Sequence, residues 1–172
     1  RHAGADPGHG HPPGRVFDMK LLLSILICQA AGLAGAAITR SSVLSWYPSL
    51  ARPPLTPPSG VFAPVWTLLY LLMGVALGLI WGRSRDLPER TRPALAVFAV
   101  QLSLNVLWSA LFFGLRSPGL ALAGIALLWI AIVRTIVLTA RISTPAAFLL
   151  APYLAWVSFA AYLNLGFYLL NR

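Results

Sequence analysis

The sequence contains few charged residues and almost no acidic ones. Only 10% of its 172 residues are charged, whereas a soluble domain has about 25%. The four acids lie in the N-terminal segment or in one connecting segment, outside every long apolar stretch: Asp6, Asp18, Asp86 and Glu89. A membrane protein without carboxylates in its spans is poorly equipped to relay protons or coordinate cations. An ion-coupled transporter is therefore the least favoured class of function.

Cysteine and histidine are equally scarce. Cys28 is the single cysteine, which excludes an intrachain disulfide. All three histidines lie near the N-terminus, where His9 and His11 would form a weak metal site at most. No cluster of carboxylates, cysteines or histidines is placed for acid–base or metal chemistry, and no glycine-rich phosphate loop follows a strand. We therefore expect no metal site, no required cofactor, and neither conventional hydrolysis nor ATP-driven transport.

Long apolar stretches make up most of the chain. Hydrophobic residues account for 58% of it, and the mean hydropathy is +0.77. Five segments reach the roughly 20 apolar residues that a spanning helix needs: about 21–39, 61–82, 93–114, 118–140 and 145–170. We predict an all-α, multi-pass integral membrane protein, a bundle of five transmembrane helices with a long proline-rich first loop. We expect a bacterial rather than an organellar membrane and leave inner versus outer open.

The first 18 residues differ from the rest. They are rich in glycine, proline and histidine and show no periodicity. Met19-Lys20, followed by three leucines, resembles a natural start. We therefore expect residues 1–18 to be disordered, either upstream of the natural start or added to it, and residues 19–172 to form the transmembrane domain.

Positive charge is plentiful, with a formal net charge of +9. The arginines are scattered at the ends of apolar runs and form no basic stripe, so we expect contacts with lipid headgroups and no nucleic-acid partner. Arg134 is the exception, because it lies well inside the fourth segment, seven residues before Arg141. Two interpretations stay open: the side chain snorkels to the headgroups, or it contacts an anion or ligand.

Three glycines, Gly74, Gly78 and Gly82, recur at every fourth position of the second segment. They share one helix face and allow another backbone to approach closely. Packing within the bundle, against small residues of the first segment, and a homodimer seam are both compatible with this pattern.

Aromatic and amide residues form stripes on three segments. In the third, Gln101, Asn105, Trp108 and Phe112 recur on one helical face, which must point inward because carboxamides in hydrocarbon need partners. Similar stripes mark the second and fifth segments: Trp66, Tyr70 and Met73, then Tyr153, Trp156, Ala160, Asn164 and Phe167. Facing one another, the stripes predict a dry cavity with indole walls, suited to a flat apolar ligand. A plain hydrogen-bonded aromatic core is the alternative.

Longer motifs include these stripes: Trp46-Tyr47, Arg52-Pro53-Pro54-x-Thr56-Pro57-Pro58, Phe62-x-Pro64-Val65-Trp66-Thr67-x2-Tyr70, Gln101-x3-Asn105-x2-Trp108 and Pro152-Tyr153-Leu154-x-Trp156-x2-Phe159-Ala160. They resemble those of the TspO/MBR family, the tryptophan-rich sensory and translocator proteins, once called peripheral-type benzodiazepine receptors. The resemblance covers about 21–172 and is distributed over four segments, which makes chance agreement improbable.

The resemblance implies a five-helix bundle, often a homodimer, whose cavity is closed by the first loop. It implies binding of porphyrins (protoporphyrin IX or haem) or sterol-like molecules, for sensing, regulation or transport. An enzyme-like degradation of protoporphyrin by light and oxygen, with Trp66 and Trp156 as candidates, and a structural protein with a vestigial cavity are the alternatives. Stripes and motifs together predict these ligand-binding residues: Trp46, Tyr47, Trp66, Tyr70, Gln101, Asn105, Trp108, Tyr153, Trp156 and Ala160.

The chain departs from the family pattern at one position. Leu55 stands where family members commonly have tryptophan before Thr-Pro-Pro, and we expect a lid without that indole to stack less well on a ligand. Near the C-terminus, Leu165-x2-Tyr168-x3-Arg172 loosely resembles a pattern proposed for cholesterol contact.

Overall fold

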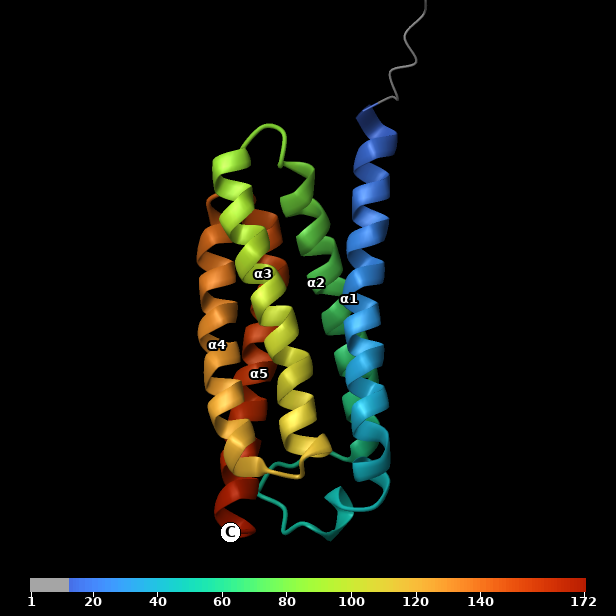
Figure 1. Cartoon of the computed structure of the whole chain (residues 1–172), viewed down its shortest axis with the longest axis vertical. Coiled ribbons are helices and arrows are strands. Elements are labelled where there is room, and N and C mark those ends of the chain that lie inside the picture. The colour runs from blue at the N-terminus through green and yellow to red at the C-terminus, as the bar shows by residue number, and fades with distance from the viewer. Residues whose placement is uncertain (1–12) are drawn as a thin grey trace, which may run out of the picture.

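Five long helices form a single bundle in the computed structural model, which describes residues 13–172 (Figure 1). They are α1 (Pro13–Leu44), α2 (Phe62–Gly82), α3 (Pro88–Ser109), α4 (Pro118–Ala140) and α5 (Thr144–Leu170). Each is long and apolar enough to cross a membrane, and the described residues contain no strand. The prediction of an all-α, five-helix, multi-pass integral membrane protein is confirmed.

Local signals in the sequence set where the later helices begin. The hydroxyls of Ser117 and Ser143 accept hydrogen bonds from the backbone N–H groups of Leu120 and Ala146, which caps α4 and α5. A proline follows within the first turn of each helix, where its fixed φ is compatible with the helix and its missing N–H costs nothing. The short turns before these caps make α3, α4 and α5 successively antiparallel.

Two helices extend beyond their predicted bounds. Residues 13–18 form the first turns of α1, so the expectation of disorder is wrong for them, while residues 1–12 lie outside the described part. At its other end α1 continues through Leu44 because Ser42, already past the apolar run, is anchored by a hydrogen bond to the Phe113 carbonyl (2.6 Å). α3 begins at Pro88, not near Pro93, because Pro88 takes the first helical position and Glu89 favours the first turn.

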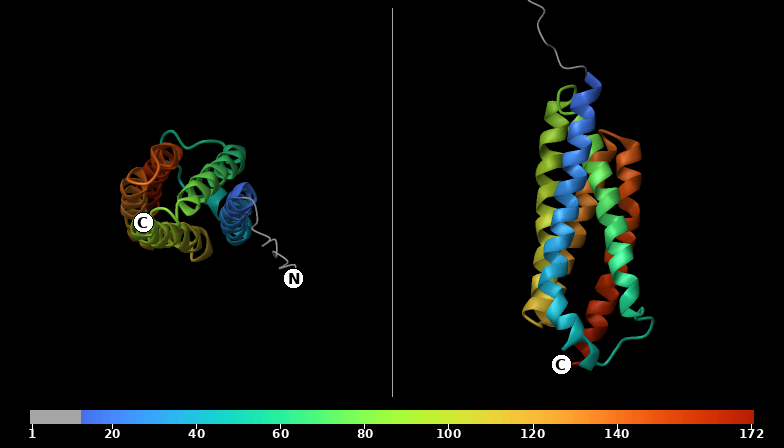
Figure 2. Two further views of the ribbon diagram at one scale, coloured as in Figure 1. Left: turned by 90° about the horizontal axis from the view of Figure 1, so that it is seen from above. Right: turned by 90° about the vertical axis from the view of Figure 1, so that its right-hand side faces the viewer.

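The helices form a closed ring in the order α1, α2, α5, α4, α3, with α3 returning to α1. Figure 2 shows this ring from above, with every helix close to parallel with the bundle axis. The segment from Ser45 to Val61, which we call the lid, crosses one end of the ring. It contains two single turns of 3₁₀ helix, Tyr47–Ser49 and Ser59–Val61.

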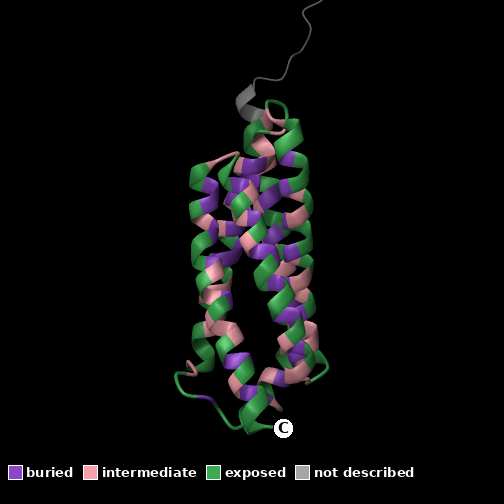
Figure 3. Ribbon diagram, turned by 90° about the vertical axis from the view of Figure 1, so that its left-hand side faces the viewer, coloured by how far each residue is buried: buried purple, intermediate pink, exposed green. Residues whose placement is uncertain are grey.

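The two halves of the bundle are packed differently. Buried positions are densest in the half away from the C-terminus (Figure 3). Large side chains that fill this half are almost fully enclosed, among them Met73, Ile80, Phe98 and Leu150. The half beneath the lid has fewer buried positions and contains the cavity described below.

The glycine face of α2 packs against α1. A Cβ atom added to Gly74 would lie 2.6 Å from the Ile25 Cα, and one added to Gly78 would lie 3.0 Å from the Leu21 Cα. Backbones can approach this closely only without side chains between them. Of the two interpretations, the structure therefore supports packing within the bundle. The partners on α1 are larger residues than predicted, since Gly32 instead makes room for the ring of Tyr70.

We expect Gly74→Ala to lower the stability of the folded bundle by about 1–3 kcal/mol, the typical cost of overpacking. The added methyl would overlap backbone atoms of α1, which cannot move aside as a flexible side chain does. The measurement is the thermal unfolding midpoint in detergent. Gly60→Ala is the matched control, because a Cβ there meets nothing within 4 Å. Equal midpoints for the two variants would contradict the close packing of α1 on α2.

Candidate ligand-binding cavity

A cavity of about 730 Å³ lies beneath the lid, enclosed by α1, α2, α3 and α5. Its volume is within the range of about 300–1,000 Å³ typical of ligand sites. Seven of the predicted ligand-binding residues lie in its lining: Tyr47, Trp66, Tyr70, Asn105, Trp108, Trp156 and Ala160. The stripes of three different helices thus meet around one space.

The floor of the cavity is a chain of buried hydrogen bonds across three helices. The Tyr70 hydroxyl donates to Asn105 Oδ1 over 2.6 Å, and Asn105 Nδ2 donates to the Tyr153 hydroxyl over 2.8 Å. Asn105 is only 1% exposed, so both ends of its amide have a partner at a depth where water is excluded. An unpaired amide here would be costly, and the floor therefore joins α2, α3 and α5 firmly.

A second chain of hydrogen bonds fixes the cavity wall. The indole N–H of Trp108 donates to Asn164 Oδ1 (3.0 Å), and Asn164 Nδ2 donates to the backbone carbonyl of Pro118 (2.8 Å). These contacts join α3, α5 and the start of α4. Because its N–H group is used in this way, Trp108 presents its ring to the cavity and not its hydrogen-bonding edge.

Aromatic faces make up much of the remaining wall. The Trp66 ring centroid lies 5.7 Å from that of Tyr70 and 6.5 Å from that of Trp108, within the separations favourable for aromatic pairs. Across the cavity mouth, Phe62 lies 6.1 Å from Trp156. The hydrogen bonds of residues 13–172 include none from the indole N–H of Trp66 or Trp156, which leaves two donors available to a ligand.

Three of the predicted residues lie outside the lining. Trp46 packs edge-on against Phe112, with centroids 5.8 Å apart. Tyr153 is fully buried beneath Asn105, and it supports the floor without reaching the cavity. Gln101 is buried one turn further from the lid, and its amide has no hydrogen-bond partner among the described residues. Helical spacing put Gln101 and Tyr153 on the right faces but could not give their depth.

The contribution of α1 was missed in the sequence. Gly32, Gly35, Ala36 and Ala37 line the cavity on this side. Their signal is the run of small residues in the first apolar segment, which we interpreted as a surface for helix packing. Small side chains there leave the space that the aromatic residues of α2 and α3 surround.

The lid closes the cavity with one aromatic side chain. Tyr47 is buried, and its ring lies 5.3 Å from Phe167 and 5.8 Å from Phe113. Phe113 belongs to a π-helical turn, Ala110–Gly114, which ends α3. Burial raises the pKa of the Tyr47 hydroxyl, and the Arg52 guanidinium, 5.9 Å from the ring, partly opposes that rise. Tyr47 is therefore neutral at physiological pH and suited to an apolar contact.

Polar contacts attach the rest of the lid to α5. The side-chain amide of Asn171 accepts a hydrogen bond from Ala51 N–H (2.9 Å) and donates one to the Ala51 carbonyl (3.0 Å). Nearby, the Tyr162 hydroxyl donates to the Pro54 carbonyl (3.2 Å). Pro53 packs closely onto Gly166 of α5. A Cβ added to Gly166 would lie only 2.5 Å from the Pro53 Cβ. The part of the lid after Tyr47 is thus fastened along α5.

Leu55 lies at the exposed turn of the lid. It has a φ of 67° and is 78% exposed, and it is not part of the cavity lining. Leu55 therefore contributes nothing to the observed cavity wall. The left-handed backbone at this position is unfavourable for a side chain such as leucine.

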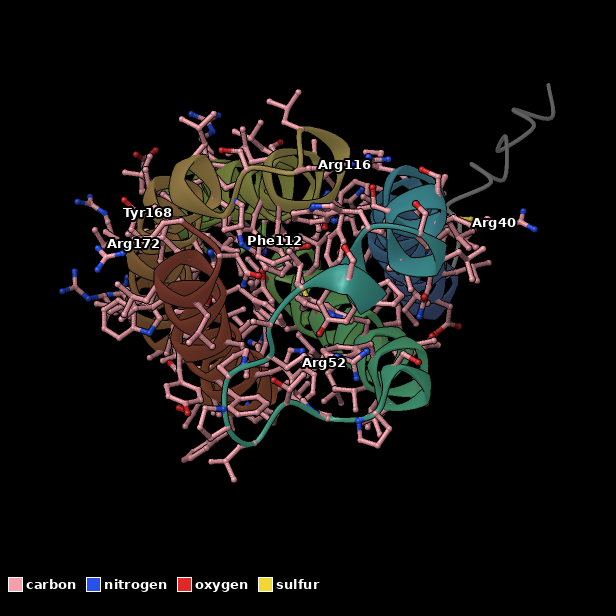
Figure 4. All side chains as sticks on the ribbon, turned by 90° about the horizontal axis from the view of Figure 1, so that it is seen from below. Arg40, Arg52, Phe112, Arg116, Tyr168 and Arg172 are labelled. Carbon is pink, nitrogen blue, oxygen red and sulfur yellow. The ribbon has the colours of Figure 1, made fainter. Side chains whose placement is uncertain are left out.

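Positive charge surrounds the lid end of the bundle. Figure 4 shows Arg40, Arg52, Arg116 and Arg172 around this end, with Arg40 pointing away from the helices. Arg40 is the one charged residue of the cavity lining among those described, and no acid contributes. An anionic group at the rim would meet favourable charge, while the interior offers apolar surface.

We expect Leu55→Asn to stabilise the lid by up to about 1 kcal/mol, because asparagine tolerates the left-handed conformation that strains leucine. The substitution removes few contacts from an exposed side chain. The measurement is the rate of limited proteolysis within residues 45–61, which should fall. Leu44→Asn, an equally exposed leucine in a helix, should not slow cleavage, and slowing by both variants would argue against relief of strain.

The same arrangement of residues occurs in a known protein family. The model of the TspO/MBR family matches residues 24–169. Tryptophan-rich protein TspO of Chlorobaculum tepidum is 45% identical over 153 residues, covering 89% of this chain and 96% of that protein. Translocator protein of Bos taurus is 40% identical over 139 residues, covering 81% and 82% respectively. The chain therefore belongs to the TspO/MBR family.

Proposed function

We propose that this membrane protein binds porphyrins in the cavity beneath the lid and acts as their sensor, regulator or transporter. One observation supports this most: the ring faces of Trp66, Tyr70 and Trp108 border one space whose deep polar atoms already have partners. Such a wall offers wide apolar contact and few hydrogen bonds. It favours a flat, apolar molecule.

A porphyrin fits this description better than a sterol does. Its aromatic plane can stack on indole and phenol rings, which gives a contribution beyond the burial of apolar area. Its acidic substituents would be costly to bury, but at the lid end they would meet the positive field of Arg40, Arg52, Arg116 and Arg172, of which Arg40 belongs to the lining (Figure 4). A sterol would use only the apolar wall. The names of relatives, a translocator protein and a tryptophan-rich sensory protein, are compatible with transport or sensing.

Titration with protoporphyrin IX in the dark should quench tryptophan fluorescence to saturation. Ala160→Leu should weaken the apparent affinity by about tenfold or more, since extra carbon atoms in a filled pocket exclude a ligand. Ala160 lines the cavity and is not one of the fluorophores. Fluorescence quenching against porphyrin concentration gives the dissociation constant of each variant.

Ala155→Leu provides the matched control, because Ala155 is exposed on the same helix and lies outside the cavity lining. Its affinity should equal that of the wild type. If Ala160→Leu and Ala155→Leu bind equally, the porphyrin is not in this cavity. Absence of saturable quenching in folded protein would instead favour a structural role with a vestigial cavity.

Light-dependent degradation of the bound porphyrin is the second candidate function. The observation that favours it is the pair Trp66 and Trp156, which line the same cavity. Indoles beside a photoexcited ligand can react without the acids and bases that this cavity lacks. Under illumination in air, Trp66→Phe and Trp156→Phe should both slow the loss of protoporphyrin absorbance.

Trp129→Phe is the control for that experiment, because Trp129 lies outside the cavity. It should leave the light-dependent rate at the wild-type value, and dark samples of every variant should be stable. Equal rates in all illuminated samples would show that the protein is a bystander to the photochemistry.

We also propose a homodimer, with one restriction from the fold. Gly74 and Gly78 are already in contact with α1. A second copy would therefore bind an outward-facing surface and not the glycine face.

A further inference from the structure

A second hollow lies on the outer surface of α4, away from the cavity beneath the lid. It has a volume of about 420 Å³, and its lining includes Trp129, Ile130, Val133, Val137 and two arginines, Arg134 and Arg141. All of these belong to or directly follow one helix, and α4 contributes nothing to the lining of the larger cavity. The hollow, which we call the α4 groove, therefore faces the surroundings of the bundle.

One wall of the α4 groove is held in place by a hydrogen bond. The Trp129 indole N–H donates to the Ser158 hydroxyl on α5 over 2.9 Å, and the residue remains 40% exposed. The hydroxyl in turn donates to the Leu154 carbonyl (2.8 Å). The ring is thus fixed at the protein surface with its polar edge turned inward. It offers an apolar face at a depth where lipid chains surround the protein.

The charged end of the groove is less easily explained. Arg134 and Arg141 are seven residues apart, which puts them two turns apart on one face of the helix. Arg134 lies six residues before the last residue of α4, or about 9 Å inside the helix end at 1.5 Å per residue. A cation at that depth is unfavourable unless an anion or water reaches it.

The protein itself supplies no such anion among its described residues. Neither arginine forms an ion pair with Asp18, Asp86 or Glu89, the acids of residues 13–172. Arg90 adds a third cation, because its guanidinium donates to the Arg141 carbonyl over 3.1 Å. The helix end therefore concentrates positive charge beside an apolar surface.

We propose that the α4 groove binds an anionic glycerophospholipid of the surrounding leaflet. Its phosphate would lie between Arg134 and Arg141, where charge-assisted hydrogen bonds from two guanidinium groups are available. One acyl chain would extend from there along Val133, Ile130 and the face of Trp129. In a phospholipid the acyl chain follows the phosphate. Along the groove the apolar wall follows the two arginines in the same order, so each part of the lipid would meet a matching surface.

Other occupants match the groove less well. A free phosphate ion would leave its apolar length uncovered. Among the described residues, a second copy of this chain would offer acids only near helix ends or in a loop, because Asp18 and Glu89 lie near the starts of α1 and α3 and Asp86 lies between α2 and α3. It would bury two like-charged faces together, which is unfavourable. The bilayer is the source of anions that is always present at this level.

The test uses the full chain in lipid nanodiscs that contain phosphatidylglycerol or phosphatidylcholine with brominated acyl chains, which quench nearby indoles. Subtracting the signal of Trp129→Phe isolates the quenching of Trp129. At equal mole fractions, brominated phosphatidylglycerol should quench Trp129 more strongly. Arg134→Gln should reduce this lipid preference by about fivefold, the effect of one basic residue at a membrane surface.

Two variants distinguish the groove from general charge effects. Arg85→Gln removes the same charge at the same end of the bundle but outside the groove, and it should keep the wild-type preference. Arg134→Lys keeps the charge, and it should retain most of the preference even if Arg134→Gln folds poorly by circular dichroism. Equal losses in Arg85→Gln and Arg134→Gln would overturn a specific site.

The remaining outcomes are equally decisive. Equal quenching of Trp129 by both lipids would mean that Arg134 only snorkels to the surface. Absence of quenching by either lipid would mean that another protein surface covers the groove. Equally strong quenching by a brominated fatty acid would show that any anionic chain suffices, against recognition of the phospholipid.

Discussion

A side-chain amide buried in hydrocarbon needs partners inside the protein, and the fold depends on how Asn105 obtains them. Tyr70 donates to its carbonyl oxygen, and its amide nitrogen donates to Tyr153. Both contacts are buried, and an amide left without a partner there would be costly. The three helices that contribute these residues are therefore held together at one level. On one side of that level the bundle is densely packed, and on the other it encloses the cavity.

The chemical character of the cavity follows from the same constraint. Trp108 uses its N–H group to bond Asn164, just as Tyr70 uses its hydroxyl in the floor. The polar atoms of Tyr70, Asn105 and Trp108 already form hydrogen bonds within the protein. The ring faces of Tyr70 and Trp108 and the other aromatic faces remain available to a ligand. Among the described residues, the indole N–H groups of Trp66 and Trp156 and the hydroxyl of Ser109 are lining donors without a hydrogen bond. A ligand is thus recognised mainly by its shape and apolar surface.

Much of this arrangement was predictable from the sequence. Apolar length predicted the number of helices, and the spacing of Asn105 and Trp108 predicted which face of α3 points inward. Depth was not predictable, because helical periodicity is the same at every level of a bundle; Gln101 and Tyr153 have the right direction but lie beyond the floor. The exposed backbone turn at Leu55 was also missed, since a left-handed residue other than glycine leaves no local signal.

The scarcity of acids links the two sites that we propose. In a soluble protein an isolated arginine is balanced by water or by a nearby carboxylate, but the described spans have acids only near their ends, at Asp18 and Glu89. The cavity lining avoids charge apart from Arg40, and Arg52, Arg116 and Arg172 lie outside the lining at the same end of the bundle. On the outer face of α4, the backbone of Arg134 is fixed by the helix, and only its side chain can reach toward the surface. Its counterion has to come from outside the chain, and at that depth only a lipid can deliver a phosphate without first exposing the surrounding apolar side chains to water.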